Sequence, residues 1–350
     1  MLRYSIGARE LESLQRLFKT LDLTNFDAKV YVTLLTLGPS SPSRLVEELA
    51  SHRPQIHGSL KRLASKGLVE VYSGRPAMYR AVPPDLALSI IESELVEDLE
   101  EAKRFLGTLR PGEANEEHGV WLYKSSKGLM NRYIKTVSES QIDLLVCGDP
   151  EFIEKLHGHL LEAQDRGVLV YVIVYEIPGV KFQEEQIEGL KKVKRAVSGD
   201  LMVVADSNIG VLSQRRLGAS VFPGYGVVVE EPVLIDYLQQ DFLYRWMRSK
   251  TVVNEPVRLP VRFTMFKLAL LEVQDLLASG VKIWGHFKGR WVHDSKGEFE
   301  GEIVKTIHDL ETGIAQMLVI TDDGNEYTVG GPDAIVEDFA VEEVYLKRVR

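Results

Sequence analysis

The stretch that decides the fold spans residues 24–84 and reads TNFDAKVYVTLLTLGPSSPSRLVEELASHRPQIHGSLKRLASKGLVEVYSGRPAMYRAVPP. Thr24 followed three residues later by Asp27 forms a variant of the capping box that opens helices. Apolar residues then recur at helical spacing until a Gly-Pro pair at 38–39 ends this helix. A Ser-Pro pair at 41–42 opens a second helix, and a third begins near Pro54 and stops at Lys66-Gly67.

Two short β runs follow the third helix, Val69–Tyr72 and Met78–Val82. They flank the turn Ser-Gly-Arg-Pro at residues 73–76, so they predict a two-stranded hairpin. Three short helices followed by a hairpin are the order of a winged helix-turn-helix, which inserts one helix into the major groove of DNA. We therefore expect this domain over residues 1–84. It includes an extra amphipathic helix at residues 1–21, which packs on the domain or on a partner subunit.

The charge of this stretch supports DNA binding. The whole chain has a formal net charge of −9, yet residues 51–84 hold six Lys and Arg residues and a single acid, Glu70. Such a basic region neutralises phosphates, although solvated cations on a protein-interaction module are the alternative. The residues predicted to contact double-stranded promoter DNA are Arg53, Gln55, His57, Ser59, Lys61 and Arg62 on the third helix, and Arg75 and Arg80 on the wing.

Composition bounds the rest of the chain. With 350 residues, 45% hydrophobic and 27% charged, the chain has the length of several domains and an ordinary soluble composition. Its one cysteine, Cys147, lies in the apolar run DLLVCG, so we expect a buried structural thiol and a cytoplasmic location. No apolar run approaches the roughly 20 residues of a membrane span, and the N-terminus lacks an apolar signal segment.

Residues 85–110 predict a long helix. Apolar residues recur at spacings of three and four, at Leu88, Ile91, Leu95, Leu99, Ala102, Leu106 and Leu109. This seam favours a coiled-coil-like dimerisation helix, because a two-fold protein matches a two-fold DNA site. Packing of the helix on its own domain is the alternative.

After a polar linker at residues 111–117, the pattern changes to short Val, Ile and Leu runs that alternate with helical segments. The expected strands are 120–123, 143–147, 168–174, 201–205 and 226–229, and the expected helices are 127–138, 150–166, 182–194 and 233–249. This alternation predicts an α/β domain over residues 118–256, with a buried and largely parallel sheet.

Residues 257–350 predict a small β-rich domain. One helix, 263–277, precedes strands at 281–292, 299–310, 315–321, 326–330 and 341–349. Turns such as Asp294–Gly297 and Asp322–Asn325 join them. We expect a partly closed barrel.

This order of parts resembles the TrmB family of archaeal sugar-sensing transcription regulators. The resemblance rests on 23–37, GSLKRLASKGLVEV at 58–71, RAVPPDLAL at 80–88, VCGDPEFI at 146–153, VVADSNIGVL at 203–212, FLYRW at 242–246, GHFKGRWV at 285–292 and TVGGPDAIVED at 328–338. It implies a repressor or activator of sugar-transport and sugar-metabolism genes. It also implies a middle domain that looks like a degenerate phospholipase-D fold, and a C-terminal domain that binds a mono- or disaccharide.

The resemblance also implies a sugar site. Carried over residue by residue, this site includes Gly330, Gly331, Ile335 and Glu337, with Gln316 and Asn325 as possible amide partners. Paired glycines let a ligand approach the backbone, and a carboxylate accepts hydrogen bonds from sugar hydroxyls. Trp284 and Trp291 lie in the same domain and are candidates for stacking on a sugar ring. Without the resemblance, a tight turn and a packed core explain the glycines and tryptophans better.

Two other classes of function compete with this interpretation. A phosphodiesterase of the phospholipase-D type needs two His-x-Lys-x4-Asp motifs, and the nearest match is a single His286-Phe-Lys288 without the aspartate in place. Neither a Gly-x-Ser-x-Gly elbow nor a phosphate-binding P-loop is present, so we expect no catalysis, no metal and no cofactor. An architectural DNA-coating protein is the second alternative, and it leaves the C-terminal β domain without a role.

Overall fold

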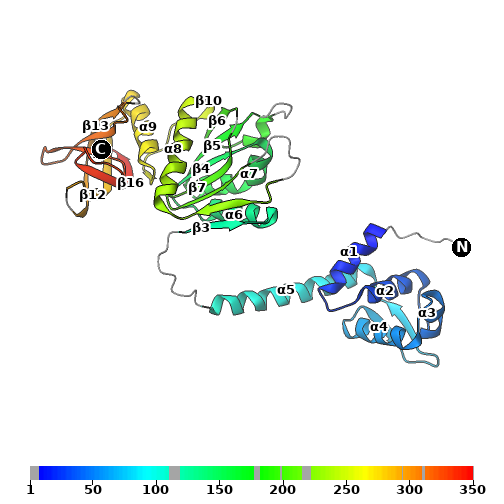
Figure 1. The fold of residues 1–350 in the computed structure, drawn as a ribbon. Helices are drawn as coiled ribbons and strands as arrows, with labels where there is room; N and C mark the ends of the chain where they lie inside the picture. The colour runs from blue at the N-terminus through cyan, green and yellow to red at the C-terminus, as the bar shows by residue number, and fades with distance from the viewer. Residues whose placement is uncertain are drawn as a thin grey trace. The chain divides into compact units, whose positions relative to one another are not determined.

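The computed structural model describes residues 8–109, 119–176, 182–197, 199–214, 222–293, 295–309 and 312–349. The chain forms two compact units, residues 1–114 and residues 115–350 (Figure 1). The predicted linker at 111–117 lies outside the described residues, as do residues 1–7 of the first helix, Arg110, Asp294 and Leu310.

The first unit is the winged helix that the sequence predicts. Its elements are α1 (Ala8–Lys19), α2 (Asn25–Leu37), α3 (Pro42–Glu48), α4 (Arg53–Ser65), β1 (Val69–Tyr72), β2 (Met78–Ala81) and α5 (Pro84–Thr108). The capping box that opens α2 is present: Thr24 Oγ1 accepts from the backbone N of Asp27 at 3.2 Å, and the Asp27 carboxylate accepts from the backbone N of Thr24 at 2.7 Å. The first helical position of α3 is Pro42, where no N–H is needed.

The extra N-terminal helix packs on this domain. Phe18 and Leu21 are buried, and the Phe18 ring centroid lies 5.6 Å from that of Tyr31 on α2. The Tyr31 hydroxyl donates a hydrogen bond of 2.9 Å to the backbone oxygen of Val82 at the end of the wing. Helix α1, helix α2 and the hairpin are thereby joined in one core.

The long helix α5 has two parts with different surroundings. Near its start, Ala87 and Ile91 are buried against the winged helix. Further along, Leu99 is 55% exposed and Leu106 is 62% exposed, and they lie on one face because they are seven residues apart. The first part therefore fits the packing alternative, and the second part presents an apolar stripe.

The second unit begins with a mixed sheet. Its strands are β3 (Val120–Tyr123), β4 (Asp143–Gly148), β5 (Leu169–Tyr175), β6 (Lys192–Ala196), β7 (Leu201–Ala205), β8 (Ile209–Ser213), β9 (Gly226–Val229) and β10 (Lys250–Asn254), in the order β10-β6-β5-β4-β7-β8-β9-β3. Among its described pairings, β4–β5 and β5–β6 are parallel and the others are antiparallel. The prediction of a largely parallel sheet is therefore wrong, as is the predicted helix at 182–194. That segment contains a single 3-10 turn, Glu184–Ile187, followed by β6, which β5 and β10 hold from both sides.

Helices cover both faces of this sheet. Helices α6 (Ser126–Glu139) and α7 (Pro150–Asp165) pack on the face that carries Leu144 and Val146. Helix α8 (Pro232–Arg248) packs on the other face, which carries Leu145 and the buried Cys147, as the period of two along a strand requires.

The C-terminal part is a closed barrel. It contains β11 (Val261–Phe263), α9 (Phe266–Ala278), β12 (Ile283–Trp291), β13 (Lys296–His308), β14 (Ala315–Ile320), β15 (Glu326–Gly330) and β16 (Phe339–Arg348). Strands β16, β12, β13, β14 and β15 pair in turn, and a parallel pairing of β15 with β16 closes the ring. Helix α9 lies between the barrel and α8, and all three share one apolar core with the sheet (Figure 1).

Candidate nucleic-acid surface and ligand cavity

Exposed cations and polar groups gather on α4 and the wing. Arg53, Gln55, His57 and Lys61 are exposed along α4, and Arg75 is exposed in the turn of the hairpin. We call these five residues the basic surface. Helix α4 occupies the position of a recognition helix, so this surface has the arrangement expected for contacts to base edges and phosphates.

Ser59 does not belong to this surface. Its side chain is fully buried, together with Ile56, Leu60 and Leu63. These positions are separated by three, four and seven residues and form the inner face of α4. The expectation that Ser59 faces outward is wrong, because the period of the helix places it on the same face as the apolar residues.

Arg62 is engaged inside the protein. Its Nε and Nη2 donate to the two oxygens of Asp27 at 2.9 and 2.7 Å, and the Asp27 side chain is fully buried. Burial by itself would raise the pKa of Asp27, but the hydrogen bonds from Arg62 and Thr24 outweigh it and hold the pKa below its usual value. The ion pair therefore fastens α4 to α2, and contact of Arg62 with DNA stays a prediction.

Arg80 also has a partner. It lies directly opposite Glu70 in the hairpin, and its Nε donates to the Glu70 carboxylate at 2.7 Å. Both side chains are exposed, so water screens this pair and its contribution to stability is small. Arg80 is thus a weaker candidate for phosphate contact than Arg75, for which no ion pair occurs among the described residues.

A cavity of about 750 Å³ lies between the α/β layer and the barrel. Its walls come from the β7–β8 turn, α8, the start of α9, β12, the segment after β15, and β16. We call it the interface cavity. Its side chains include Asn208, Asp236, Gln239, Gln240, Phe266, Lys267, Lys288 and Asp333.

Charges of both signs line the interface cavity, with Asp206, Asp236, Asp333, Glu342 and Glu343 against Lys267 and Lys288. Burial raises the pKa of Asp236, and the nearby carboxylate of Asp333 raises it further. Lys267 Nζ donates to Gln240 Oε1 at 2.8 Å, and Gln239 Nε2 donates to Ser207 Oγ at 2.5 Å. Planar carboxylates and amides beside the apolar Phe266 are the chemistry of a site for a polar, uncharged ligand.

The predicted sugar residues lie partly at this cavity. Gly331 lines it. Its neighbour Gly330 is in contact with Glu337: a Cβ atom at position 330 would lie 2.8 Å from Glu337 Cδ. Glu337 is 8% exposed and has no ion pair among the described residues, but like Gly330 and Gln316 it is not among the residues that line the interface cavity. Met317 pairs with Val329 in the antiparallel β14–β15 hairpin. The next pair of positions is Gln316 and Gly330, which therefore lie side by side.

Two predicted residues are placed elsewhere. Asn325 lies at the opposite end of the β14–β15 hairpin, roughly 16 Å along the strand from Gly330, and its Nδ2 donates to Asp323 at 2.6 Å. Asn325 precedes the first residue of β15 and Gly330 is the last, so the whole strand lies between them. Ile335 is 76% exposed and is not among the residues that line the interface cavity. The expectation that Asn325 lies beside the glycine pair is therefore wrong.

The two tryptophans have structural partners. Trp291 packs against Phe299, Tyr327 and Phe339 with ring centroids 5.0–5.3 Å apart. Trp284 Nε1 donates to Glu300 at 3.0 Å. Packing in the barrel thus accounts for Trp291, and neither residue lines the interface cavity.

Several residues of the interface cavity were missed by sequence reasoning. Asp236, Gln239 and Gln240 are the clearest, because they form a polar stripe at i, i+3 and i+4 in a helix that the sequence did predict. The residues Lys267, Lys288 and Asp333 carry no such signal, since they meet only through the tertiary fold.

A winged helix in one chain with a unit that contains a cavity of small-molecule size is the architecture of transcriptional regulators. Family models match the chain for the sugar-specific transcriptional regulator TrmB over residues 18–85, and for the N-terminal and C-terminal subdomains of the TrmB and TrmB/TrmBL1 effector-binding domain over residues 119–253 and 258–349. The chain belongs to the TrmB family. The predicted resemblance is thereby confirmed.

Named relatives agree with this. The sugar-sensing regulator TrmBL1 of Pyrococcus furiosus is 31% identical over 170 residues, 48% of this chain and 50% of TrmBL1, so the match spans half the length of that relative. The DNA-binding repressor TrmBL2 of Thermococcus kodakarensis is 26% identical over 55% of this chain and 75% of its own. A solved structure of TrmBL2, described as an archaeal chromatin protein, covers 71% of this chain and 100% of its own at 20% identity and a TM-score of 0.40.

Within the described ranges, no helix has both the length and the apolar character that a bilayer crossing requires. The same residues contain no group of three or more His, Cys, Asp or Glu side chains arranged to hold a metal ion.

Proposed function

We propose that this protein is a homodimeric regulator that binds promoter DNA through its winged helix and a mono- or disaccharide at the interface cavity. The observation that carries the proposal is the lining of that cavity, where the carboxylates of Asp236 and Asp333 and the amide of Gln240 lie beside Gly331 and Phe266. A carboxylate in such a position needs hydrogen-bond donors, and the hydroxyls of a sugar supply them without adding charge.

The basic surface supports the DNA side of the proposal. Arg53 lies in the first turn of α4 and Lys61 in its third, while Arg75 extends from the wing. Cations at these three places can contact phosphates on both sides of a groove, and Gln55 and His57 between them can reach base edges. The apolar stripe of α5, with Leu99 and Leu106, supplies a dimer seam that would place two such surfaces on a two-fold site.

The interface cavity supports the sugar side. Its volume of about 750 Å³ falls within the usual range of small-molecule sites, about 300–1,000 Å³. Asp236, Gln240 and Asp333 offer planar acceptors for paired hydroxyls, and Phe266 offers an apolar face for the carbon side of a ring. The backbone at Gly331 has no side chain to obstruct the ligand.

The position of the cavity suggests how a sugar alters the protein. Its walls belong to the α/β layer on one side and to the barrel on the other, so a bound sugar fixes their spacing. For the sugar to regulate DNA binding, each ligand must change the affinity for the other by the same factor, typically about 5- to 150-fold.

The sugar site is tested by calorimetric titration of the full chain with maltose, trehalose, sucrose and glucose. We expect saturable binding of at least one sugar, about tenfold weaker in Glu337→Gln and in Gln240→Ala, because each loses one or two hydrogen bonds. Asn325→Ala is the matched control, since it removes an amide of the same barrel at the far end of the hairpin and should leave the affinity unchanged. Absence of binding by all four sugars, or equal affinity in all variants, would contradict the proposal.

The proposal includes no catalytic activity. The relatives named above are transcriptional regulators. His286 and Lys288, the nearest approach to a phospholipase-D motif, lie on β12 of the barrel, outside the α/β layer where that chemistry would take place.

A further inference from the structure

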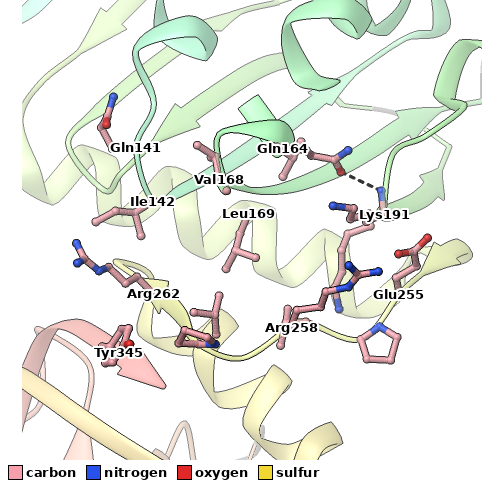
Figure 2. Close-up of a pocket in the computed structure, with 17 residues that line it drawn as sticks. Gln141, Ile142, Gln164, Val168, Leu169, Lys191, Glu255, Arg258, Arg262 and Tyr345 are labelled. Atoms are coloured by element: carbon pink, nitrogen blue, oxygen red, sulfur yellow. Dashed lines mark hydrogen bonds between the residues drawn. The ribbon is translucent and has the colours of Figure 1, made fainter. Parts of the chain in front are cut away.

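A second cavity, of about 450 Å³, lies between the α/β layer and the barrel (Figure 2). It shares no lining residue with the interface cavity. Its floor is apolar and is formed by Ile142, Val168 and Leu169 from the α/β layer and by Val257 and Val261 from the segment that leads into the barrel. We call it the basic cavity, because of the side chains at its rim.

Three cations stand around this floor without a carboxylate partner among the described residues: Lys191, Arg258 and Arg262. Lys192, in contrast, is buried and held by both oxygens of Glu272 at 2.7 and 2.8 Å. The acid among the lining residues is Glu255, which is exposed, as Lys191, Arg258 and Arg262 are, and which lies at the same end as Lys191 and Arg258 (Figure 2). The rim therefore carries an excess of positive charge in a protein whose net charge is −9.

The cations occupy two ends of the cavity. Figure 2 shows Lys191 and Arg258 on one side, Arg262 and Tyr345 on the other, and Leu169 between them. Arg262 lies over the ring of Tyr345, with its guanidinium carbon 6.0 Å from the ring centroid. An elongated ligand can thus place an anionic group at one end and a flat or apolar body across the floor.

We infer that the basic cavity binds a small organic phosphate. Guanidinium groups match the geometry of phosphate oxygens, and two cations at one end can share the charge of a phosphate dianion. A neutral sugar would leave these cations without a counter-charge, so the ligand differs in class from that of the interface cavity. A free inorganic ion would leave the apolar floor uncovered, which favours a phosphate that carries an organic body.

The two cavities adjoin through one carboxylate. Asp206, which lines the interface cavity, accepts hydrogen bonds from the backbone N of Gln141 at 2.8 Å and of Ile142 at 2.7 Å, and both of these residues line the basic cavity. The organic body of a ligand that covers the floor would lie against Ile142, whose backbone Asp206 holds from a wall of the other cavity.

The test is calorimetric titration of the full chain with AMP, glucose 6-phosphate and inorganic pyrophosphate, with citrate and glucose as comparison ligands. We expect AMP or glucose 6-phosphate to bind saturably and more tightly than pyrophosphate and citrate. Which of the two binds distinguishes a nucleotide from a sugar phosphate. Arg258→Gln and Arg262→Gln should each weaken this binding about tenfold, because each removes one charge-assisted contact.

The control variants separate this site from other cations. Arg348→Gln removes an exposed arginine of β16 outside the cavity, and Lys61→Gln removes a cation of the basic surface, so neither should change the phosphate affinity. The inference is overturned if none of the organic phosphates binds, if citrate binds as tightly as they do, or if Lys61→Gln weakens binding as much as Arg258→Gln. Sugar binding in the interface cavity is measured separately with glucose, so the two proposals can fail independently.

Discussion

The basic surface and the interface cavity arrange their charges in opposite ways. On the winged helix, Arg53, Lys61 and Arg75 are exposed, and no ion pair to them occurs among the described residues. In the cavity wall, Lys267 donates a hydrogen bond to Gln240. The carboxylate of Asp333 lies near that of Asp236 and raises its pKa. The first arrangement is the one expected to attract an anionic polymer, and we proposed the second as the site of a polar ligand without net charge.

This difference predicts how each site responds to its surroundings. Binding at the basic surface should weaken steeply with salt, because each phosphate contact releases counterions. Binding in the interface cavity should depend little on salt, since a neutral ligand displaces no ions.

The largest effect is expected from the apolar stripe of α5. Leu99→Asp combined with Leu106→Asp should give a monomer and lower the affinity for a promoter fragment by about 100-fold or more, because two linked half-site contacts become one. The sugar affinity should not change, since α5 belongs to the other unit. Sedimentation velocity and fluorescence anisotropy measure the two effects, with Ser93→Asp as the exposed control on the same helix. A double variant that remains dimeric would place the dimer interface elsewhere.

Lys61 and Arg62 are adjacent cations with different surroundings, and they sharpen the contrast within the winged helix. Arg62→Ala should lower the free energy of unfolding by about 2 kcal/mol, because the buried Asp27 carboxylate loses its partner while part of the pair is exposed to water. Lys61→Ala should leave stability unchanged and reduce the slope of log affinity against log salt by about 1. All four tryptophans lie in the other unit, so tryptophan fluorescence in urea follows that unit, and its comparison with far-UV circular dichroism gives the unfolding of the winged helix. The assignment fails if Arg62→Ala flattens the salt dependence without loss of stability.

The smallest effect concerns two aspartates whose pKa values are shifted in opposite directions. The pKa of Asp27 is lowered on folding, so its contribution to stability is present above about pH 3.9 and is lost as the pH falls through the lowered value. The pKa of Asp236 is raised, so its charged form disfavours folding, and this penalty disappears as the pH falls through the raised value.

At pH 7, Asp27→Asn should therefore destabilise the winged helix, while Asp236→Asn should stabilise the other unit by a few tenths of a kcal/mol. Urea unfolding at pH 7 and pH 4 measures both, with tryptophan fluorescence for the second unit. A lower free energy of unfolding of Asp236→Asn at pH 7 would contradict this assignment, because it would mean that the Asp236 carboxylate forms a stabilising ion pair or hydrogen bond.

Local signals explain why the winged helix was predicted almost completely. The Thr24–Asp27 box, Pro42 and Gly67 each act within a few residues, and the structure has helix ends at the corresponding places. The mixed sheet was not predictable in this way. Strand β6 has the sequence KVKRA, and it is a strand because β5 and β10 pair with it from both sides.

The same division applies to the sites. The outward positions of α4 follow from the helical period alone, and the same period places Ser59 on the buried face, although its polar side chain favoured an outward position. The glycine pair and Glu337 came from the family resemblance, whereas Lys267 and Asp333 come together only when the barrel meets α8. Residues that meet through tertiary structure leave no spacing in the sequence from which to find them.

The most direct test of the account is a thermodynamic cycle between sugar and DNA. The affinity of the full chain for a promoter fragment is measured with and without a saturating sugar, and the affinity for that sugar is measured with and without DNA. We predict that both affinities change by the same factor, about 5- to 150-fold, and that Glu337→Gln needs about tenfold more sugar for the same effect. A sugar that binds at the interface cavity and leaves the DNA affinity unchanged would contradict this account.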